Sequence, residues 1–308
     1  MYNSKTLSIM KKILLSISAV MAMMAMTATF SACSSDDEQE SSSAKLIINA
    51  SRGNYGQFTR NIALSDNDNI VTTWKKSDNV FAYKEGWTGQ IGTLNPKDDS
   101  NNNVTKLEGD VKAEGLSVGS NIEFITPRNE WDYTGQDGTI PTISSKYDYA
   151  TARVQVTFFD QDNKVYGTTA SFETQQAIIK YKLFYIDKDD NTKKALNVKT
   201  LTIVAGQGKL VKSRDLDGKN VVYGGLEVTS SSANGTSEFY VALRNDYTGA
   251  DTYTLTAKDK NGTIYTSATS AAHTYSFRDY ISHEVVLSAY DDTYTERDTY
   301  KNKVEQTW

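Results

Sequence analysis

The sequence is poor in cysteine, proline and histidine, with one, three and two of them in 308 residues. A single cysteine cannot form an intramolecular disulfide. His273 and His283 lie outside any metal-ligand spacing, and we interpret both as hairpin or surface residues. Acidic residues outnumber basic ones by 38 to 33, which leaves no basic stripe for nucleic-acid phosphates. From the few cysteines and histidines and the excess of acidic residues, we predict no metal, no cofactor and no nucleic-acid partner.

After residue 30 the sequence also has no long stretch with helical periodicity. Its apolar and polar residues alternate instead, as in strands. The 19 tyrosines favour strands, and Asp-Gly and Asn-Gly pairs indicate tight turns between the strands. The length fits about two domains, so the predicted fold class is all-β, with two β-sandwich domains. The predicted strands are 79–84, 121–126, 152–159, 177–186, 199–204, 238–243, 252–258 and 283–288, and the turn pairs are Asp137-Gly138, Asp217-Gly218, Asn234-Gly235 and Asn261-Gly262.

The single long apolar run, residues 13–30, follows two lysines and ends just before Cys33. This layout is typical of a secretory signal peptide, here 1–32, and the alternative is a transmembrane helix. The stretch "FSAC" (30–33) resembles the bacterial lipobox, whose cysteine carries a diacylglycerol. Lipidation of Cys33 would protect an oxidisable lone thiol, and several acyl chains such as palmitate would anchor the protein lastingly.

An acidic, serine-rich tether follows, residues 33–44. Its first part, "SSDDE" (34–38), resembles the acidic export signal of surface lipoproteins in the Bacteroidetes. The alternative interpretation is a solvated tether without a signal. The predicted location is therefore the outer membrane, with the protein exposed at the cell surface.

Several short motifs invite an enzymatic or binding interpretation. "GLSVG" (115–119) matches a nucleophile elbow, but it leads into a strand and not into a helix. Asp187 and its neighbours imitate the start of a calcium loop but lack its glycine and glutamate, so we predict a hairpin turn. We therefore expect no enzyme. Three aromatic residues that we expect to be exposed, Trp74, Trp87 and Trp131, could stack on sugars, although core packing is the more common role.

Four segments carry a family resemblance: "TTWKKSDNVFAYK" (72–84), residues 116–149 with their "GQDGT", "FETQQAIIKYKL" (172–183) and residues 238–266. In this order they resemble the fimbrillins, the pilin-like surface lipoproteins of the Bacteroidales. "FRDYISHEVVL" (277–287) departs from the family pattern. The "GQDGT" stretch itself is predicted to be structural, a compact turn in which an aspartate caps backbone N–H groups.

The resemblance implies two transthyretin-like β-sandwich domains and a fimbrial subunit or related adhesin. We place the domains at 45–174 and 175–308, the second with a tail at 291–308. The implied partners are other fimbrial subunits, joined by β-strand addition, and a host or bacterial surface ligand. Stalk, tip and anchor positions remain open, and the alternative function is a monomeric glycan-binding outer-membrane lipoprotein.

Fimbrillins are cut by an arginine-specific protease after their first strand. Here "AKLIINAS" (44–51) predicts a strand, and the loop behind it contains Arg52 and Arg60. Cleavage would free this strand and leave a groove that another chain's strand can fill. The candidate donor is the tail, in which three side chains share one face of an extended strand: Tyr300, Val304 and Trp308.

Overall fold

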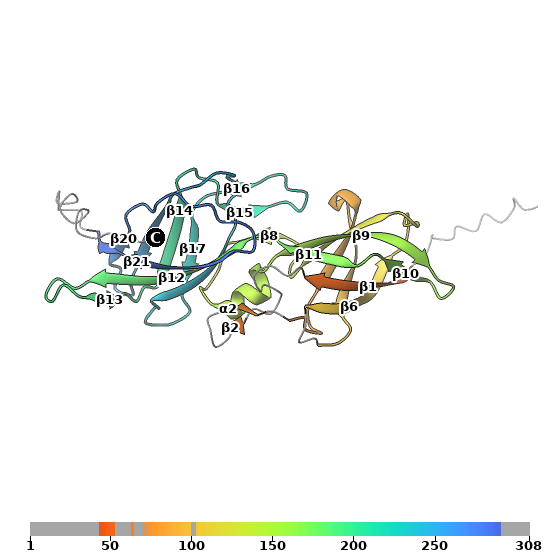
Figure 1. The fold of residues 1–308 in the computed structure, drawn as a ribbon, viewed down its shortest axis with the longest axis horizontal. Coiled ribbons are helices and arrows are strands. Elements are labelled where there is room, and N and C mark those ends of the chain that lie inside the picture. Colours follow the sequence, from red (N-terminus) through yellow and green to blue (C-terminus); the bar gives the residue numbers. More distant parts are fainter. Residues whose placement is uncertain (1–42, 53–62, 65–69, 72, 100–102, 291–308) are drawn as a thin grey trace, which may run out of the picture. The chain divides into compact units, whose positions relative to one another are not determined.

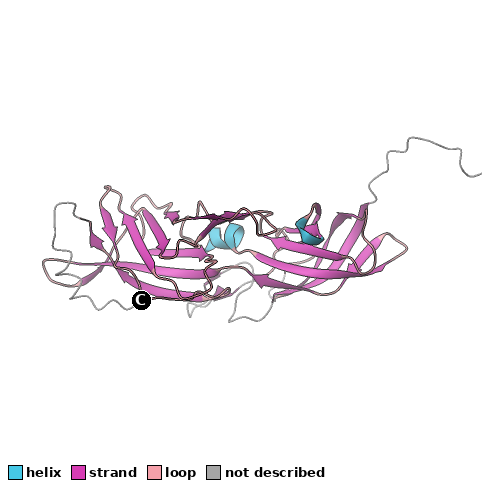
Figure 2. Ribbon diagram, turned by 90° about the horizontal axis from the view of Figure 1, so that it is seen from above, coloured by secondary structure: helices cyan, strands magenta, loops and turns pink. Residues whose placement is uncertain are grey.

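The computed structural model describes residues 43–52, 63–64, 70–71, 73–99 and 103–290. Strands make up nearly all of the regular structure (Figure 2). Within these ranges, helical turns are confined to η1 (Glu85–Trp87), α2 (Ile140–Thr142) and η2 (Ile143–Tyr147). In this described part, no helix is long and apolar enough to cross a membrane. The all-β prediction is confirmed, and the transthyretin-like detail stays a prediction.

The first sheet has eight strands in the order β10-β1-β11-β9-β7-β4-β5-β6. Figure 1 labels five of them: β1, β6, β9, β10 and β11. β1 also pairs with β6, so the sheet closes on itself. A separate two-stranded ladder joins β2 (Ala63–Leu64) to β3 (Ile70–Val71). The strands of the closed sheet are β1 (Ser43–Arg52), β4 (Val80–Lys84), β5 (Gln90–Pro96), β6 (Val104–Lys112), β7 (Asn121–Thr126), β9 (Ala150–Phe159), β10 (Lys164–Gly167) and β11 (Ala170–Thr174).

Strand β1 forms because its apolar residues recur at every second position, which places them on one face. Ala44, Leu46, Ile48 and Ala50 are buried in the core inside the closed sheet. One edge of β1 pairs antiparallel with β6 along nine residues. The other edge pairs parallel, first with β10 and then with β11. Both backbone edges of β1 are therefore occupied.

The second half of the chain forms two larger sheets around a common core. In the first of them, β12 pairs antiparallel with β13 and β18 and parallel with β21. The second has the order β17-β14-β19-β20-β22. Their bounds are β12 (Ala177–Ile186), β13 (Lys193–Ala195), β14 (Thr200–Ala205), β17 (Leu226–Thr229), β18 (Glu238–Leu243), β19 (Tyr253–Lys258), β20 (Ile264–Thr266), β21 (Tyr280–Val286) and β22 (Ser288–Ala289).

A small third ladder joins distant parts of the chain. It consists of β16 (Val222–Tyr223), β15 (Val211–Arg214) and β8 (Trp131–Asp132). Residues 131–149 accordingly pack in the hydrophobic cluster of the second half, whereas the other cluster holds only residues between 44 and 172. The predicted domain boundary at 174 coincides with the end of β11, and the division into two domains stays a prediction.

Each of the eight predicted strands overlaps an observed strand, and three agree at both ends: "NIEFIT", "AIIKYKLFYI" and "EFYVAL". The turn pairs at Asp217 and Asn261 connect β15 to β16 and β19 to β20, as predicted. Asp137-Gly138 does not connect a hairpin, because it leads into α2 instead. Asp137 accepts hydrogen bonds from Thr139 N at 2.9 Å and from Thr142 Oγ1 at 2.7 Å, which confirms its predicted capping role.

Candidate functional site

The predicted processing site falls at the end of β1. Arg52 is the last residue of this strand, and its backbone lies opposite Phe172 of β11. The other predicted site residues lie outside the described residues. They are the predicted lipidation residue Cys33, the second cleavage candidate Arg60, and the candidate donor residues Tyr300, Val304 and Trp308. All of these assignments stay predictions.

The motifs that imitate catalytic and metal sites are turns. At 115–119 the Ser117 backbone N–H donates to Ser120 Oγ at 2.9 Å, and the chain enters β7 at Asn121. In the calcium-like loop, Asp187 N donates to Thr192 O at 2.9 Å, which closes the β12–β13 hairpin as predicted. No group of three or more His, Cys, Asp or Glu side chains within the described ranges is arranged to hold a metal ion.

The surface interpretation of His283 is wrong. This residue lies in β21 opposite Tyr181 of β12, a parallel pairing that turns its ring inward and leaves it 5% exposed. Its Nε2 is 3.0 Å from Tyr275 Oη, and the His273 ring centroid is 5.4 Å away. Burial, followed by the nearby His273, lowers the pKa of His283 to about 4.

Two of the three tryptophans that we expected to be exposed are core residues. Trp74 is 1% exposed and packs edge-on against Phe172 at 5.5 Å. Trp131 is 2% exposed and packs against Tyr149 at 5.1 Å. Trp87 is only partly buried, with its ring 5.4 Å from Tyr83. Of these three rings, Trp87 is the one that reaches the surface.

Trp87 lines a cavity of about 350 Å³, which we call the Arg214 cavity. The cavity lies where the small third ladder forms, because β8 and β15 place Trp131 opposite Arg214. The guanidinium carbon of Arg214 stands 4.4 Å from the centroid of the Trp131 ring. The full lining is Trp87, Asn129, Glu130, Arg214, Asp215, Leu216 and Asp217.

A second cavity, of about 320 Å³, lies beside β17 and includes Gln136. The Gln136 side chain is buried, and its Nε2 donates to Tyr133 O at 2.9 Å and to Ala242 O at 2.8 Å. Its Oε1 accepts from Ala242 N at 2.8 Å. These bonds tie the "GQDGT" stretch to β18, so Gln136 has a structural role.

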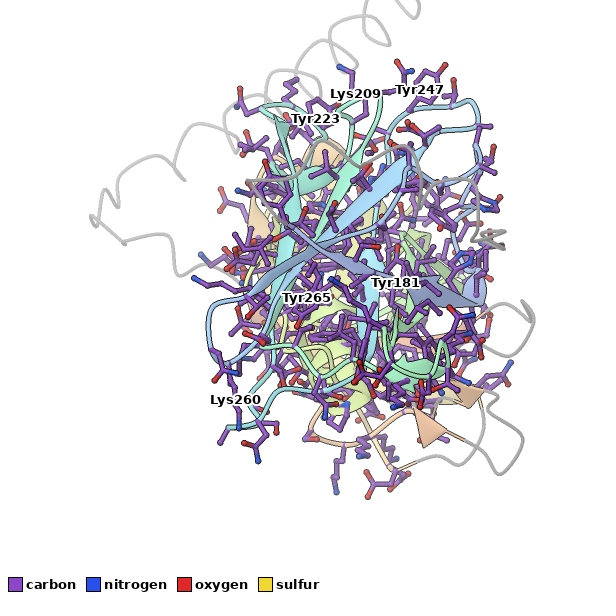
Figure 3. The ribbon with its side chains drawn as sticks, turned by 90° about the vertical axis from the view of Figure 1, so that its left-hand side faces the viewer. Tyr181, Lys209, Tyr223, Tyr247, Lys260 and Tyr265 are labelled. Carbon is purple, nitrogen blue, oxygen red and sulfur yellow. The ribbon has the colours of Figure 1, made fainter. Side chains whose placement is uncertain are left out.

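Two exposed tyrosines form a separate surface group. Figure 3 shows Tyr223 and Tyr247 on the same side of the molecule as Lys209. The Lys209 Nζ lies 4.6 Å from the Tyr223 ring centroid, and Tyr223 Oη donates to Asp246 Oδ2 at 3.3 Å. The polar groups of Tyr223 and Lys209 are thus engaged with neighbouring side chains.

The sequence matches no protein-family model and no curated protein. Solved structures do match. The chain is similar in structure to fimbrial proteins of the Bacteroidales. A fimbrial protein from Bacteroides ovatus is 12% identical with a TM-score of 0.36, and the match covers 82% of this chain and 54% of that one. A fimbrilin from Porphyromonas gingivalis W83 is 14% identical with a TM-score of 0.32, covering 71% and 72%.

A variant of the shaft pilin of Lactobacillus rhamnosus GG also matches, at 12% identity and a TM-score of 0.34, with 81% of this chain and 99% of that one covered. This chain spans about half the length of the Bacteroides ovatus protein. At these identities and scores the similarity is limited to the fold. It gives no information on what this protein binds or assembles with.

Proposed function

We propose that this protein is a fimbrial, pilin-like subunit or a related adhesin that is exported as a lipoprotein and assembles by strand exchange at the outer cell surface. The placement of β1 carries the proposal. This strand occupies the closed sheet between β6 on one edge and β10 and β11 on the other. Burial of Leu46 and Ile48 contributes about 3–6 kcal/mol, and the two alanines of the same face add less.

A strand in this position is the element whose loss creates an acceptor. Cleavage after Arg52 or Arg60 would separate β1 from all later strands of its sheet. The ladder edges of β6, β10 and β11 would lose their partner, and the groove that held Leu46 and Ile48 would face solvent. A strand from another chain would restore both the hydrogen bonds and the apolar contacts.

The proposed donor is the tail 291–308 of a second subunit. Because donor and groove are different surfaces, each subunit can accept one strand and supply another. Such a heterologous contact propagates as an open filament. The motif resemblance to fimbrillins at 72–84 and 116–149 supports the same assembly mode.

Cleavage and donation can be tested separately. We expect Arg60→Ala combined with Arg52→Ala to block polymerisation, because β1 then stays in its own sheet. We expect deletion of 291–308 to leave an acceptor without a donor, which ends the polymer. The measurement is the ladder of SDS-resistant species on gels, with the intact chain as control. Ladders of full length from both variants would disprove strand exchange, and ladders from the tail deletion alone would indicate a tip-like subunit.

Lipid attachment at Cys33 can be tested by replacing this residue. A Cys33→Ser variant should accumulate as an uncleaved precursor and should take up no labelled palmitate, because the acceptor sulfur is missing. Surface display would be measured by protease accessibility on intact cells. Replacing Ser34 by Ala is a matched control that leaves the sulfur in place and should keep the label. Normal palmitate labelling of Cys33→Ser would show that the lipid is not on this residue.

A further inference from the structure

We propose that the Arg214 cavity binds a neutral pyranose residue of a glycan. This goes beyond a role in assembly, because it gives the subunit a ligand site of its own. The proposal rests on three features of the lining: a guanidinium that forms no ion pair with any described residue, the aromatic side chain of Trp87, and the composition of the remaining wall.

Arg214 has a fixed position but, as far as the described residues go, no ion-pair partner. Its guanidinium carbon is stacked 4.4 Å from the centroid of the buried Trp131 ring, and the Arg244 guanidinium carbon lies 5.7 Å from the same centroid. Among the described residues Arg214 forms no salt bridge, and its buried Nε has no hydrogen-bond partner. The stack fixes the plane of the guanidinium, so its donors are oriented before a ligand arrives.

The neighbouring cations are already paired. Arg128 forms an ion pair with Glu130, Lys219 Nζ lies 2.8 Å from Asp217 Oδ2, and Arg244 Nε lies 2.9 Å from Asp246 Oδ1. Arg214 differs from these three because it lines the cavity and, within the described part of the chain, forms no ion pair with a carboxylate. A guanidinium carries five N–H donors, and a pair of adjacent hydroxyl oxygens can accept two of them.

Trp87 supplies a partly buried aromatic side chain to the lining. It lies in the loop between β4 and β5, which is closed by Lys84 N donating to Gly89 O at 3.0 Å. The backbone of Trp87 has a φ of 60°, a region that bulky residues rarely adopt. An unusual backbone of this kind persists where the surrounding structure imposes it, and it points to a functional use of the side chain. The polarised C–H groups on one face of a pyranose ring fit against an indole ring.

The rest of the wall selects the class of ligand. Three carboxylates line the cavity beside Arg214: Glu130, Asp215 and Asp217. Glu130 is paired with Arg128 and Asp217 with Lys219, so three cations and three anions balance in and around the cavity. A site without net positive charge offers phosphates and acidic sugars no net attraction, so the proposal commits to a neutral sugar. Each carboxylate has about four acceptor positions, so hydroxyl donors can still be accepted beside the existing ion pairs. A volume of about 350 Å³ is at the small end for ligand pockets, which suits one or two sugar rings.

Fluorine NMR of the full chain labelled with 5-fluorotryptophan tests the proposal. The Trp87 resonance is identified by its absence from Trp87→Phe. The probes are methyl β-D-galactopyranoside, methyl α-D-mannopyranoside and methyl β-D-glucopyranoside, with glucuronic acid as the charged comparison. We expect at least one neutral glycoside to shift the Trp87 resonance saturably, and glucuronic acid to bind more weakly.

Arg214→Lys keeps the charge and removes the planar donor fork, so we expect affinity to fall roughly tenfold or more. Phe158→Ala removes an aromatic ring that is 56% exposed elsewhere and should leave affinity unchanged. The proposal is overturned if no neutral glycoside shifts Trp87, if glucuronic acid binds more tightly, or if Arg214→Lys binds as well as the wild type. The SDS-resistant ladder of Arg214→Lys, measured in parallel, separates failure of this proposal from failure of assembly.

Discussion

A Leu46→Asp variant is expected to lose the closed first sheet. Leu46 is 0% exposed in the middle of β1, where its backbone lies opposite Gly109 on one side and Val165 on the other. The substitution removes a buried apolar side chain and leaves a carboxylate in its place without a partner. The expected loss of stability exceeds about 4 kcal/mol, a large part of the roughly 5–15 kcal/mol that keeps a domain folded. Urea unfolding followed by tryptophan fluorescence measures it.

Asn49→Asp is the matched control, because Asn49 is in the same strand with its side chain exposed. A surface change of this kind should alter stability by less than about 0.5 kcal/mol. If Leu46→Asp unfolds at the same urea concentration as Asn49→Asp, β1 is not an integral strand of this sheet. The strand-exchange proposal would then lose its structural basis.

Acidification from pH 7 to pH 4 is expected to cost about 3 kcal/mol of stability through His283 alone. Burial lowers the pKa of this histidine to about 4 in the folded protein, against an ordinary value of 6.5. Between these two values the unfolded chain binds the proton more readily than the folded one. Stability is therefore fully present above about pH 6.5 and falls as the pH is lowered, until both states are protonated below about pH 4.

The tyrosines that face His283 do not titrate in this pH range. Tyr275 Oη, Tyr181 and His273 surround its ring, and burial raises the pKa of both tyrosines, so they stay neutral throughout this range. His283→Gln keeps a hydrogen-bonding partner for Tyr275 and cannot take up a proton. The free energy of unfolding, measured from pH 7 to pH 4, should fall less steeply in this variant. Equal slopes in both proteins would show that His283 does not control the acid response.

The positions of strands and turns could be predicted from the sequence because they depend on residues close together in the chain. Alternation sufficed for β9, whose buried residues alternate with more exposed ones and whose end at Phe159 agrees with the predicted segment, since one buried face is enough to impose a period of two. The turns at Asp217 and Asn261 were likewise predictable, because in each of them a glycine follows the Asp or Asn and allows the tight turn. Asp137 caps nearby groups as expected, although the turn leads into α2 and not into a hairpin.

By itself the sequence thus determined the all-β class, most strand positions and the alternation that makes β1 half buried. Only the tertiary structure decided what each strand pairs with: Ser43 lies opposite Lys112, and Trp131 opposite Arg214. The same long-range pairings buried Trp131 and His283, which look exposed in the sequence, and created the Arg214 cavity. The physical reason is that alternation specifies that a face is buried, whereas the partner that buries it is selected by packing between residues far apart in the chain.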